Sequence, residues 1–320
     1  MKSKKIKKNT QEKKNNEMFY RKIEDRYIDP FTDFGFKKLF GQECNKDLLL
    51  DFLNELFHKK EGRIVSISYL NTEKLGIVEN TRKAVLDLFC ENEKGEKFIV
   101  ELQTTKQTFF KDRTLYYSTF PIIEQAPAGE WDFKLKSVYI VAILNFVFDE
   151  DKNNPHKYRY DIMLSDIETH KVFYDKLTFT YLEMPKFTKE VDELKTHFDK
   201  WMYVIKNLKR LDNIPDKFRN SIFEKMFAAA EVAKLTPEEY MNYLKTFYAY
   251  NDWDNCLATA KREAAEEGRA EGIAEGKAEG KAEAIEFVVL QANRNGFTIE
   301  QIQSLTRLSE EQIIEILNRF

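Results

Sequence analysis

The sequence predicts a mixed α/β domain followed by a helical C-terminal extension. Residues 84–103 alternate apolar and polar side chains around a turn that contains Gly95, which is typical of a β-hairpin. Residues 137–148 are almost entirely apolar, as in a strand that is buried on both faces between flanking helices. From Thr188 onward, apolar residues recur every three to four positions, which indicates amphipathic helices.

The composition is that of a globular protein. The chain has 320 residues, a 42% share of hydrophobic residues and a formal net charge of −3, so the whole molecule is not a basic nucleic-acid binder. It contains no run of eighteen apolar residues, and its basic N-terminus lacks the apolar segment of a secretory signal. We therefore expect no membrane partner.

The cysteines favour a cytoplasmic location. Cys44, Cys90 and Cys256 are scattered and odd in number, which indicates a reducing compartment without a disulfide framework. The four histidines lie far apart, and no spacing of Cys or His residues suits zinc.

Residues 1–24 form a basic segment that we expect to be disordered. The first 22 residues carry a local charge of +7. Such a tail either solubilises the protein or acts as an arm that contacts phosphate groups.

Helices are expected before the hairpin. Thr32 or Asp33 would cap a helix over residues 32–40, and residues 48–57 continue the helical period. Residues 63–69 alternate and predict a strand, whereas residues 71–83 are polar and predict a loop or bend.

The hairpin gathers acidic side chains on one face. With the centre of the bend at Lys94, Asp87 falls opposite Glu101, and Gln103 shares the face of Glu101. The opposite face is predicted to be core; it carries Leu86, Leu88, Phe98, Val100 and Leu102. Facing carboxylates repel each other unless a cation lies between them, and the oxygen ligands favour Mg²⁺ or Mn²⁺. The alternative is that Glu101 faces solvent at a sheet edge or pairs with a lysine.

After the hairpin, residues 107–125 show a helical period in which Arg113 and Tyr117 share one face. This pair either belongs to a core stripe with an extended Arg, or Arg113 reaches a phosphate near the cation. Pro121 would kink or end the helix. Residues 158–165 and 178–184 add two strands.

The C-terminal part is predicted to be helical. Gly268, Gly272, Gly276 and Gly280 recur within a segment rich in Ala, Glu and Lys, which is either a self-associating helix or a linker. The last residues contain two capping boxes, and their second helix is acidic, which argues against a DNA-reading role. We expect this unit to pack or to mediate homo-oligomerisation.

One ordered set of residues resembles a known family. Asp33 within PFTDFGFKKLFG, Asp87, the Glu101-Leu102-Gln103 triplet, and Arg113 with Tyr117 resemble the PD-(D/E)XK nuclease superfamily. More narrowly, they are similar to the Rpn family of recombination-promoting nucleases and putative transposases. The resemblance covers roughly residues 25–190 and implies a restriction-endonuclease-like core in the order α-β-β-β-α-β.

The resemblance implies a Mg²⁺- or Mn²⁺-dependent DNA endonuclease. Asp33, Asp87 and Glu101 would bind the metal, and Asp87, Glu101 and Gln103 would be catalytic. The implied phosphate contacts are Lys37, Arg82, Arg113 and Tyr117. Gln103 stands where the superfamily usually has Lys, although the narrower Rpn pattern itself has Glu-x-Gln.

The predicted organisation has five parts: a basic tail (1–24), a nuclease-like domain (25–187), a helical region (188–262), a Gly-repeat helix or linker (263–284) and a small helical unit (285–320). A catalytically degenerate nuclease-fold protein, acting as a DNA-binding or protein-interaction module, is the alternative to the endonuclease.

Overall fold

The computed structural model describes residues 23–74, 84–126 and 129–319. The chain divides into two compact units, Met1–Tyr250 and Asn251–Phe320. Residues 1–22 of the predicted basic tail and Arg82 lie outside the described residues.

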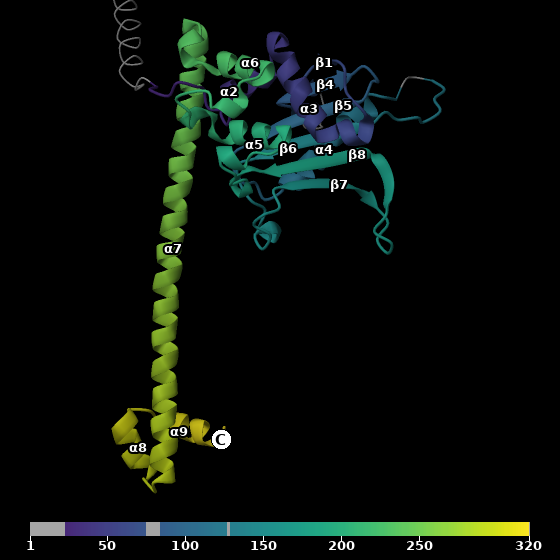
Figure 1. Ribbon diagram of the computed structural model, residues 1–320. Helices are drawn as coiled ribbons and strands as arrows, with labels where there is room; N and C mark the ends of the chain where they lie inside the picture. The colour runs from purple at the N-terminus through teal and green to yellow at the C-terminus, as the bar shows by residue number, and fades with distance from the viewer. Residues whose placement is uncertain (1–22, 75–83, 127–128, 320) are drawn as a thin grey trace, which may run out of the picture. The chain divides into compact units, whose positions relative to one another are not determined.

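The first unit is built on a six-stranded mixed sheet with the strand order β1-β4-β5-β6-β8-β7 (Figure 1). Strand β6 pairs in parallel with β5 and with β8, and the other neighbours are antiparallel. The strands are β1 (Ile67–Tyr69), β4 (Leu88–Asn92), β5 (Lys97–Gln103), β6 (Val138–Leu144), β7 (Arg159–Ser165) and β8 (Val172–Glu183). Every residue of β6 is buried, as the apolar run predicted.

Helices cover both faces of this sheet. One face packs against α2 (Asp33–Phe40), α3 (Lys46–Glu61), α5 (His197–Asn207), α6 (Ser221–Ala230) and the start of α7 (Pro237–Arg294). Trp201 of α5 lies at the centre of this cluster, with its ring 5.8 Å from those of Phe40 and Phe52. The other face packs against α4 (Phe110–Ile123). The order α3-β1-β4-β5-α4-β6 is the predicted core order, and the predicted fold class is confirmed.

The structure corrects three details before and within the hairpin. Strand β1 has only three ladder residues, because the backbone amides of Val65 and Ser66 donate to the Glu93 side chain instead. Strand β2 (Glu73–Lys74) lies where a loop or bend was expected, and it pairs with β3 (Ala84–Val85), which was expected to begin the first hairpin strand. Leu86 packs on the α4 side rather than with Leu88, because the chain bends between β3 and β4 and interrupts the alternation.

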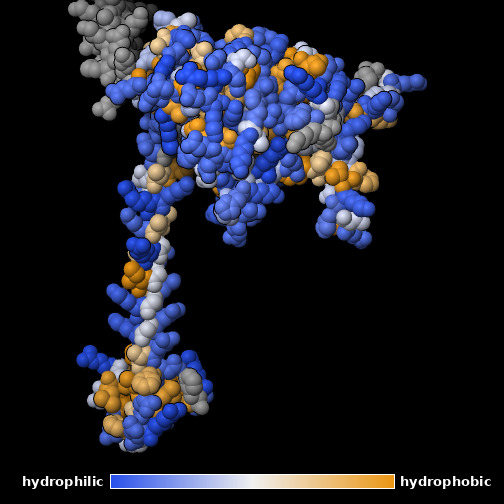
Figure 2. Space-filling model, viewed as in Figure 1, coloured by the Kyte–Doolittle hydropathy of each residue, from blue (hydrophilic) through white to orange (hydrophobic). Residues whose placement is uncertain are grey.

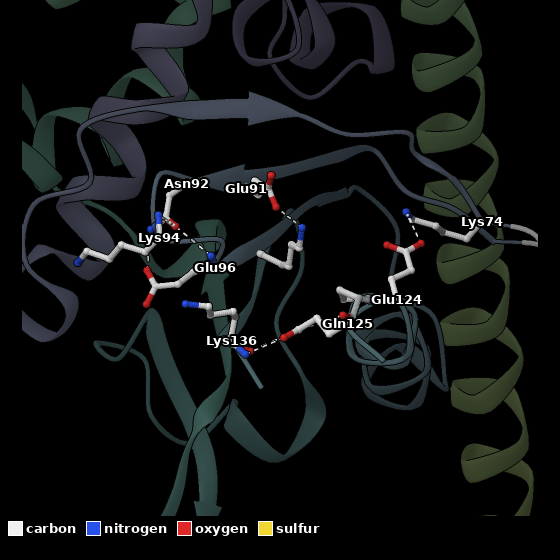
Figure 3. Close-up of polar contacts among 10 residues, drawn as sticks. Lys74, Glu91, Asn92, Lys94, Glu96, Glu124, Gln125 and Lys136 are labelled. Atoms are coloured by element: carbon white, nitrogen blue, oxygen red, sulfur yellow. Dashed lines mark hydrogen bonds and ion pairs between the residues drawn. The ribbon is translucent and has the colours of Figure 1, made fainter. Parts of the chain in front are cut away.

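The β4–β5 hairpin turns through Glu93, Lys94 and Gly95. The side-chain oxygen of Asn92 accepts hydrogen bonds from the amides of Lys94 and Glu96, at 3.0 and 2.9 Å (Figure 3). Its amide donates to the Glu96 carboxylate at 2.6 Å. Gly95 has a φ of +77°, the left-handed conformation that a three-residue loop with a bulge requires at its end. The pairing that follows, Leu88 with Val100 and Phe89 with Ile99, is the register predicted from the bend.

The helices that follow the sheet share its core. Phe223 of α6 and Tyr243 of α7 belong to the same buried cluster as residues of β4, β5 and β6. Thr236 and Glu239 form a capping pair at the start of α7, with Pro237 as its first residue. The domain boundaries proposed at residues 187 and 262 stay predictions.

The second unit contains the C-terminal part of α7, α8 (Ile299–Thr306) and α9 (Glu310–Asn318). Both predicted capping boxes are present, Thr298 with Gln301 and Ser309 with Gln312. A small core joins the three helices through Val289, Ala292, Ile302 and Ile313. The Gly-repeat segment is helical throughout, and a Cβ added at any of its four glycines would meet nothing within 4 Å. In the described ranges, no helix has the length and apolar character that a membrane crossing needs.

Candidate active site

Asp87 and Glu101 lie side by side where the hairpin strands meet the bend before β4. The pairing of Leu88 with Val100 places the two acidic residues opposite each other at the next position. The backbone amide of Asp87 donates to Oε1 of Glu101 at 3.1 Å. The backbone amide of Leu102 donates in return to Oδ2 of Asp87 at 2.8 Å. These two reciprocal bonds hold the carboxylates together as predicted.

Glu101 is removed from water and Asp87 is half-buried, which corrects the expectation that only the opposite face is core. Phe89 and Ile99 share the face of the carboxylates and pack in the cluster beneath α4. Glu101 is only 3% exposed. The cause is that α4 covers this face, which the alternation along the two strands alone did not reveal.

Burial and mutual repulsion perturb both carboxyl groups. Loss of hydration is the main cause that raises the pKa of Glu101, and the adjacent Asp87 carboxylate raises it further. Burial also raises the pKa of Asp87, while the bond from the Leu102 amide and the charge of Lys37 oppose the rise. Because both pKa values are raised, a nearby cation would stabilise the charged forms of both carboxyl groups.

Arg113 is the charged side chain from α4 that reaches this pair. Its Nη2 lies 4.0 Å from Oε2 of Glu101 and donates a hydrogen bond to Oε1 of Gln103. Its Nη1 donates to Oε1 of Gln107 at 2.6 Å. The guanidinium carbon lies 5.6 Å from the ring centre of Tyr117, so the predicted neighbours Arg113 and Tyr117 do share a face.

Both polar atoms of the Gln103 side-chain amide form hydrogen bonds. Its oxygen accepts from Arg113, and its Nε2 donates to the carbonyl oxygen of Thr105 at 2.7 Å. The side chain is 9% exposed. Gln103 therefore holds Arg113 in position beside Glu101.

Asp33 and Lys37 lie on the surface of α2. Thr32, not Asp33, caps this helix, through a bond from the Gly35 amide at 3.0 Å. Asp33 forms an ion pair with Lys37 at 2.7 Å, one helical turn away, and both side chains are exposed. Both are nonetheless close enough to act on Asp87, since the charge of Lys37 lowers its pKa and that of Asp33 raises it.

A family model described as PD-(D/E)XK nuclease family transposase matches residues 30–260. This span includes all the described site residues and most of the chain. The chain belongs to this family. No curated protein and no solved structure matches it.

The oxygen atoms of the acidic pair suit the hard divalent cations that nucleases of this family typically use. Among the described residues, neither Oδ1 of Asp87 nor Oε2 of Glu101 accepts a hydrogen bond. No three His, Cys, Asp or Glu side chains in the described ranges form a group that would hold a metal ion. The structure thus places Asp87 beside Glu101, but it does not bring Asp33 into the same group of possible ligands. Two carboxylates fit Mg²⁺, which usually takes one or two protein carboxylates and fills its other positions with water and substrate phosphate.

A groove adjoins the acidic pair on the side of α4. Arg113 and Tyr117 line it, together with Phe109, Tyr116 and Val85. The sequence predicts no functional role for Phe109 and Tyr116, because their helical spacing is typical of a core stripe. Phe109 and Tyr116 are exposed instead. Phe109 is the N-cap residue immediately before α4, so its side chain does not lie on the buried face of the helix.

Proposed function

We propose that this chain is a Mg²⁺- or Mn²⁺-dependent DNA endonuclease that hydrolyses phosphodiester bonds. The observation that supports it best is the pair of the buried Glu101 and the half-buried Asp87, with the Arg113 guanidinium beside it. Two adjacent carboxylates that are shielded from water destabilise the fold unless a cation lies near them. A metal-dependent nuclease needs a bound cation for phosphodiester hydrolysis. Membership of a nuclease family supports the reaction class.

The site residues have different proposed roles: some bind the metal ion, one faces the phosphate, and one positions a neighbouring side chain. Asp87 and Glu101 are the proposed metal ligands, with Asp33 as a further carboxylate near them. A bound cation would polarise the phosphoryl oxygen and lower the pKa of a water molecule that attacks phosphorus. Arg113 is placed to offset the charge that builds up on the phosphate, because it lies beside Glu101 without being neutralised by a close ion pair. Gln103 positions Arg113.

Three further residues are proposed phosphate contacts. Lys37 and Tyr117 flank the site from α2 and α4, and each is within reach of a site residue: Lys37 acts on the pKa of Asp87, and the Tyr117 ring lies beside Arg113. Arg82, which precedes β3 outside the described residues, is proposed from the sequence alone.

Plasmid cleavage with purified protein tests the function. Wild type is assayed with Mg²⁺, with Mn²⁺ and with EDTA, beside Glu101→Ala and the nearly isosteric Glu101→Gln. Glu91→Ala is the matched control, because Glu91 is a carboxylate of the same hairpin that pairs with Lys97 far from the site. We expect metal-dependent cutting that both Glu101 variants lose and the control keeps. Cutting that survives in folded Glu101→Gln would place the chemistry elsewhere.

The second candidate function is that of a catalytically degenerate nuclease-fold protein that binds DNA or another protein. The observation that favours it is Gln103, an uncharged residue where the superfamily usually has Lys and whose amide is occupied at both ends. This candidate predicts that no metal produces cutting, while DNA or a partner still binds.

We also propose self-association through the second unit and a cytoplasmic location. Apolar side chains are exposed on the second unit, where Figure 2 shows them gathered; they include Phe287, Phe297 and Leu305. The described cysteines form no disulfide, which suits a reducing compartment. Light scattering on wild type and Leu305→Glu tests the association. The control is Phe173→Glu, which changes an exposed residue of β8. An oligomer lost only in Leu305→Glu supports the proposal, and a monomeric wild type refutes it.

A further inference from the structure

The groove beside the acidic pair exposes aromatic rings. Phe109 is 71% exposed and Tyr116 is 39% exposed, and both line the groove with Arg113. The ring of Phe109 packs against no other ring among the described residues, whereas Tyr116 is held edge-on by Phe120 with ring centres 5.1 Å apart. Exposed rings beside a site of chemistry indicate a ligand that presents a flat, apolar surface.

The same groove offers little positive charge to a DNA backbone. Of the two described groove residues that carry positive charge, Lys106 pairs with Asp149, whereas Arg113 bonds the neutral side chains of Gln103 and Gln107 and keeps its charge. Asp112 adds a negative charge to the lining. Binding to continuous duplex depends mainly on neutralising several phosphates with Lys and Arg, and the described part of this groove offers one cation without a close ion pair, Arg113.

We propose that the groove binds unpaired bases of DNA, so that the substrates of the site are single strands and junctions or ends with unpaired nucleotides. This inference rests on the proposed nuclease function and specifies its substrate. In a duplex, the faces of the bases are hidden in the stack, and a side chain cannot lie on them. An unpaired base exposes its face, and stacking on Phe109 and Tyr116 would place its neighbouring phosphate beside Arg113 and the carboxylates.

Binding by fluorescence anisotropy tests the inference. The probes are a short labelled single strand, the duplex of the same sequence and the matching RNA strand, each in EDTA so that metal-dependent cutting is prevented. We expect wild type to bind the single DNA strand more tightly than the duplex. Phe109→Ala should weaken single-strand binding by roughly 5- to 100-fold, the range expected for loss of one stacked base.

A matched control separates stacking from the general loss of an aromatic ring. Phe173→Ala removes an 84%-exposed ring from β8 outside the groove and should leave binding unchanged. Tyr116→Ala should weaken binding in the same direction as Phe109→Ala. Equal affinity for strand and duplex, equal effects of Phe109→Ala and Phe173→Ala, or tighter binding of RNA than of the DNA strand would each overturn the inference.

Cleavage of the same DNA probes, assayed with Mg²⁺, distinguishes this inference from the proposed function. If wild type cuts duplex as fast as single strands, in a manner that depends on Glu101, the endonuclease stands and the substrate preference fails. If Phe109 governs single-strand binding but no probe is cut, the groove assignment stands and the nuclease activity fails.

Discussion

Arg113 lies 4.0 Å from Glu101, close enough for electrostatic attraction but beyond a hydrogen bond, while its two terminal nitrogens donate to Gln103 and Gln107. Both glutamines are neutral acceptors. They fix the guanidinium without cancelling its charge, so Arg113 remains available to an anion that enters the site.

Arg113→Ala should slow cleavage while leaving metal binding intact. We expect the single-turnover rate to fall on the order of 10²-fold, since a preorganised cation near the reacting phosphate is lost. The affinity for Mn²⁺, measured by calorimetric titration, should stay equal or rise because a nearby positive charge is gone. Arg113→Lys is the control that keeps the positive charge but loses the two terminal nitrogens of the guanidinium. Its cleavage rate should lie between those of wild type and Arg113→Ala. A wild-type rate in Arg113→Ala would contradict the assignment.

Gln103→Lys, which introduces the usual superfamily residue, should not raise activity. Lys cannot accept the bond from Arg113 and would bring a second cation against it in a buried position. We expect a loss of about 1–3 kcal/mol in the free energy of unfolding, measured by urea denaturation. Gln107→Lys is the matched control, since Gln107 bonds the same guanidinium from an exposed position, and it should change stability by less than about 0.5 kcal/mol. Faster cutting by a stable Gln103→Lys would refute this role.

Glu101→Gln should stabilise the metal-free protein, increasingly so at high pH. Burial raises the pKa of Glu101 to about 8 in the folded protein, from an ordinary value of 4.5. Between these values the folded state binds more protons than the unfolded state, so the stability of wild type falls as pH rises. Gln carries no charge and avoids this loss, which we expect to reach about 1–3 kcal/mol.

The measurement is the difference in Tm between Glu101→Gln and wild type across this pH window, in EDTA and in Mg²⁺. The difference should grow with pH in EDTA and shrink in Mg²⁺, which would stabilise wild type alone. Glu91→Gln serves as the control at a carboxylate paired with Lys97. A difference that does not change with pH would mean that Glu101 is ionised throughout.

Two glycine-to-alanine substitutions should change the free energy of unfolding in opposite directions. A Cβ at Gly35 would lie 2.0 Å from the carbonyl oxygen of Asp29, a backbone atom that cannot move aside, so Gly35→Ala should cost about 2–4 kcal/mol. At Gly272 a Cβ meets nothing within 4 Å, and the higher helix propensity of Ala should add about 0.8–1 kcal/mol to the stability of α7. Denaturation followed by circular dichroism measures both, and a destabilised Gly272→Ala would indicate a close neighbour at that glycine.

The hairpin and its acidic pair could be predicted because the information is local. The turn at Gly95 fixes the register within a few residues, and the register alone puts Asp87 opposite Glu101. The capping boxes of α8 and α9 were predictable for the same reason, since each needs only residues three positions apart.

Features that depend on distant packing could not be predicted. Phe89 and Ile99 share the face of the carboxylates by alternation, but the strand sequences do not show that α4 covers this face and buries it. The bonds of Arg113 to both Gln103 and Gln107, and the exposure of Phe109, arise from where α4 begins relative to the end of β5. Asp33 matched the motif in sequence, yet its carboxylate is held by Lys37 on the surface of α2.

The loop Glu93–Gly95 also constrains how this family can vary. Gaining or losing one residue there would shift the pairing of β5 by one position and turn Glu101 toward α3, away from Arg113. Such a chain would retain apolar side chains on both sides of the sheet, but its acidic pair would be broken. Length changes should therefore accumulate elsewhere along the chain, and hairpin length should separate relatives that keep the acidic pair from those that have lost it.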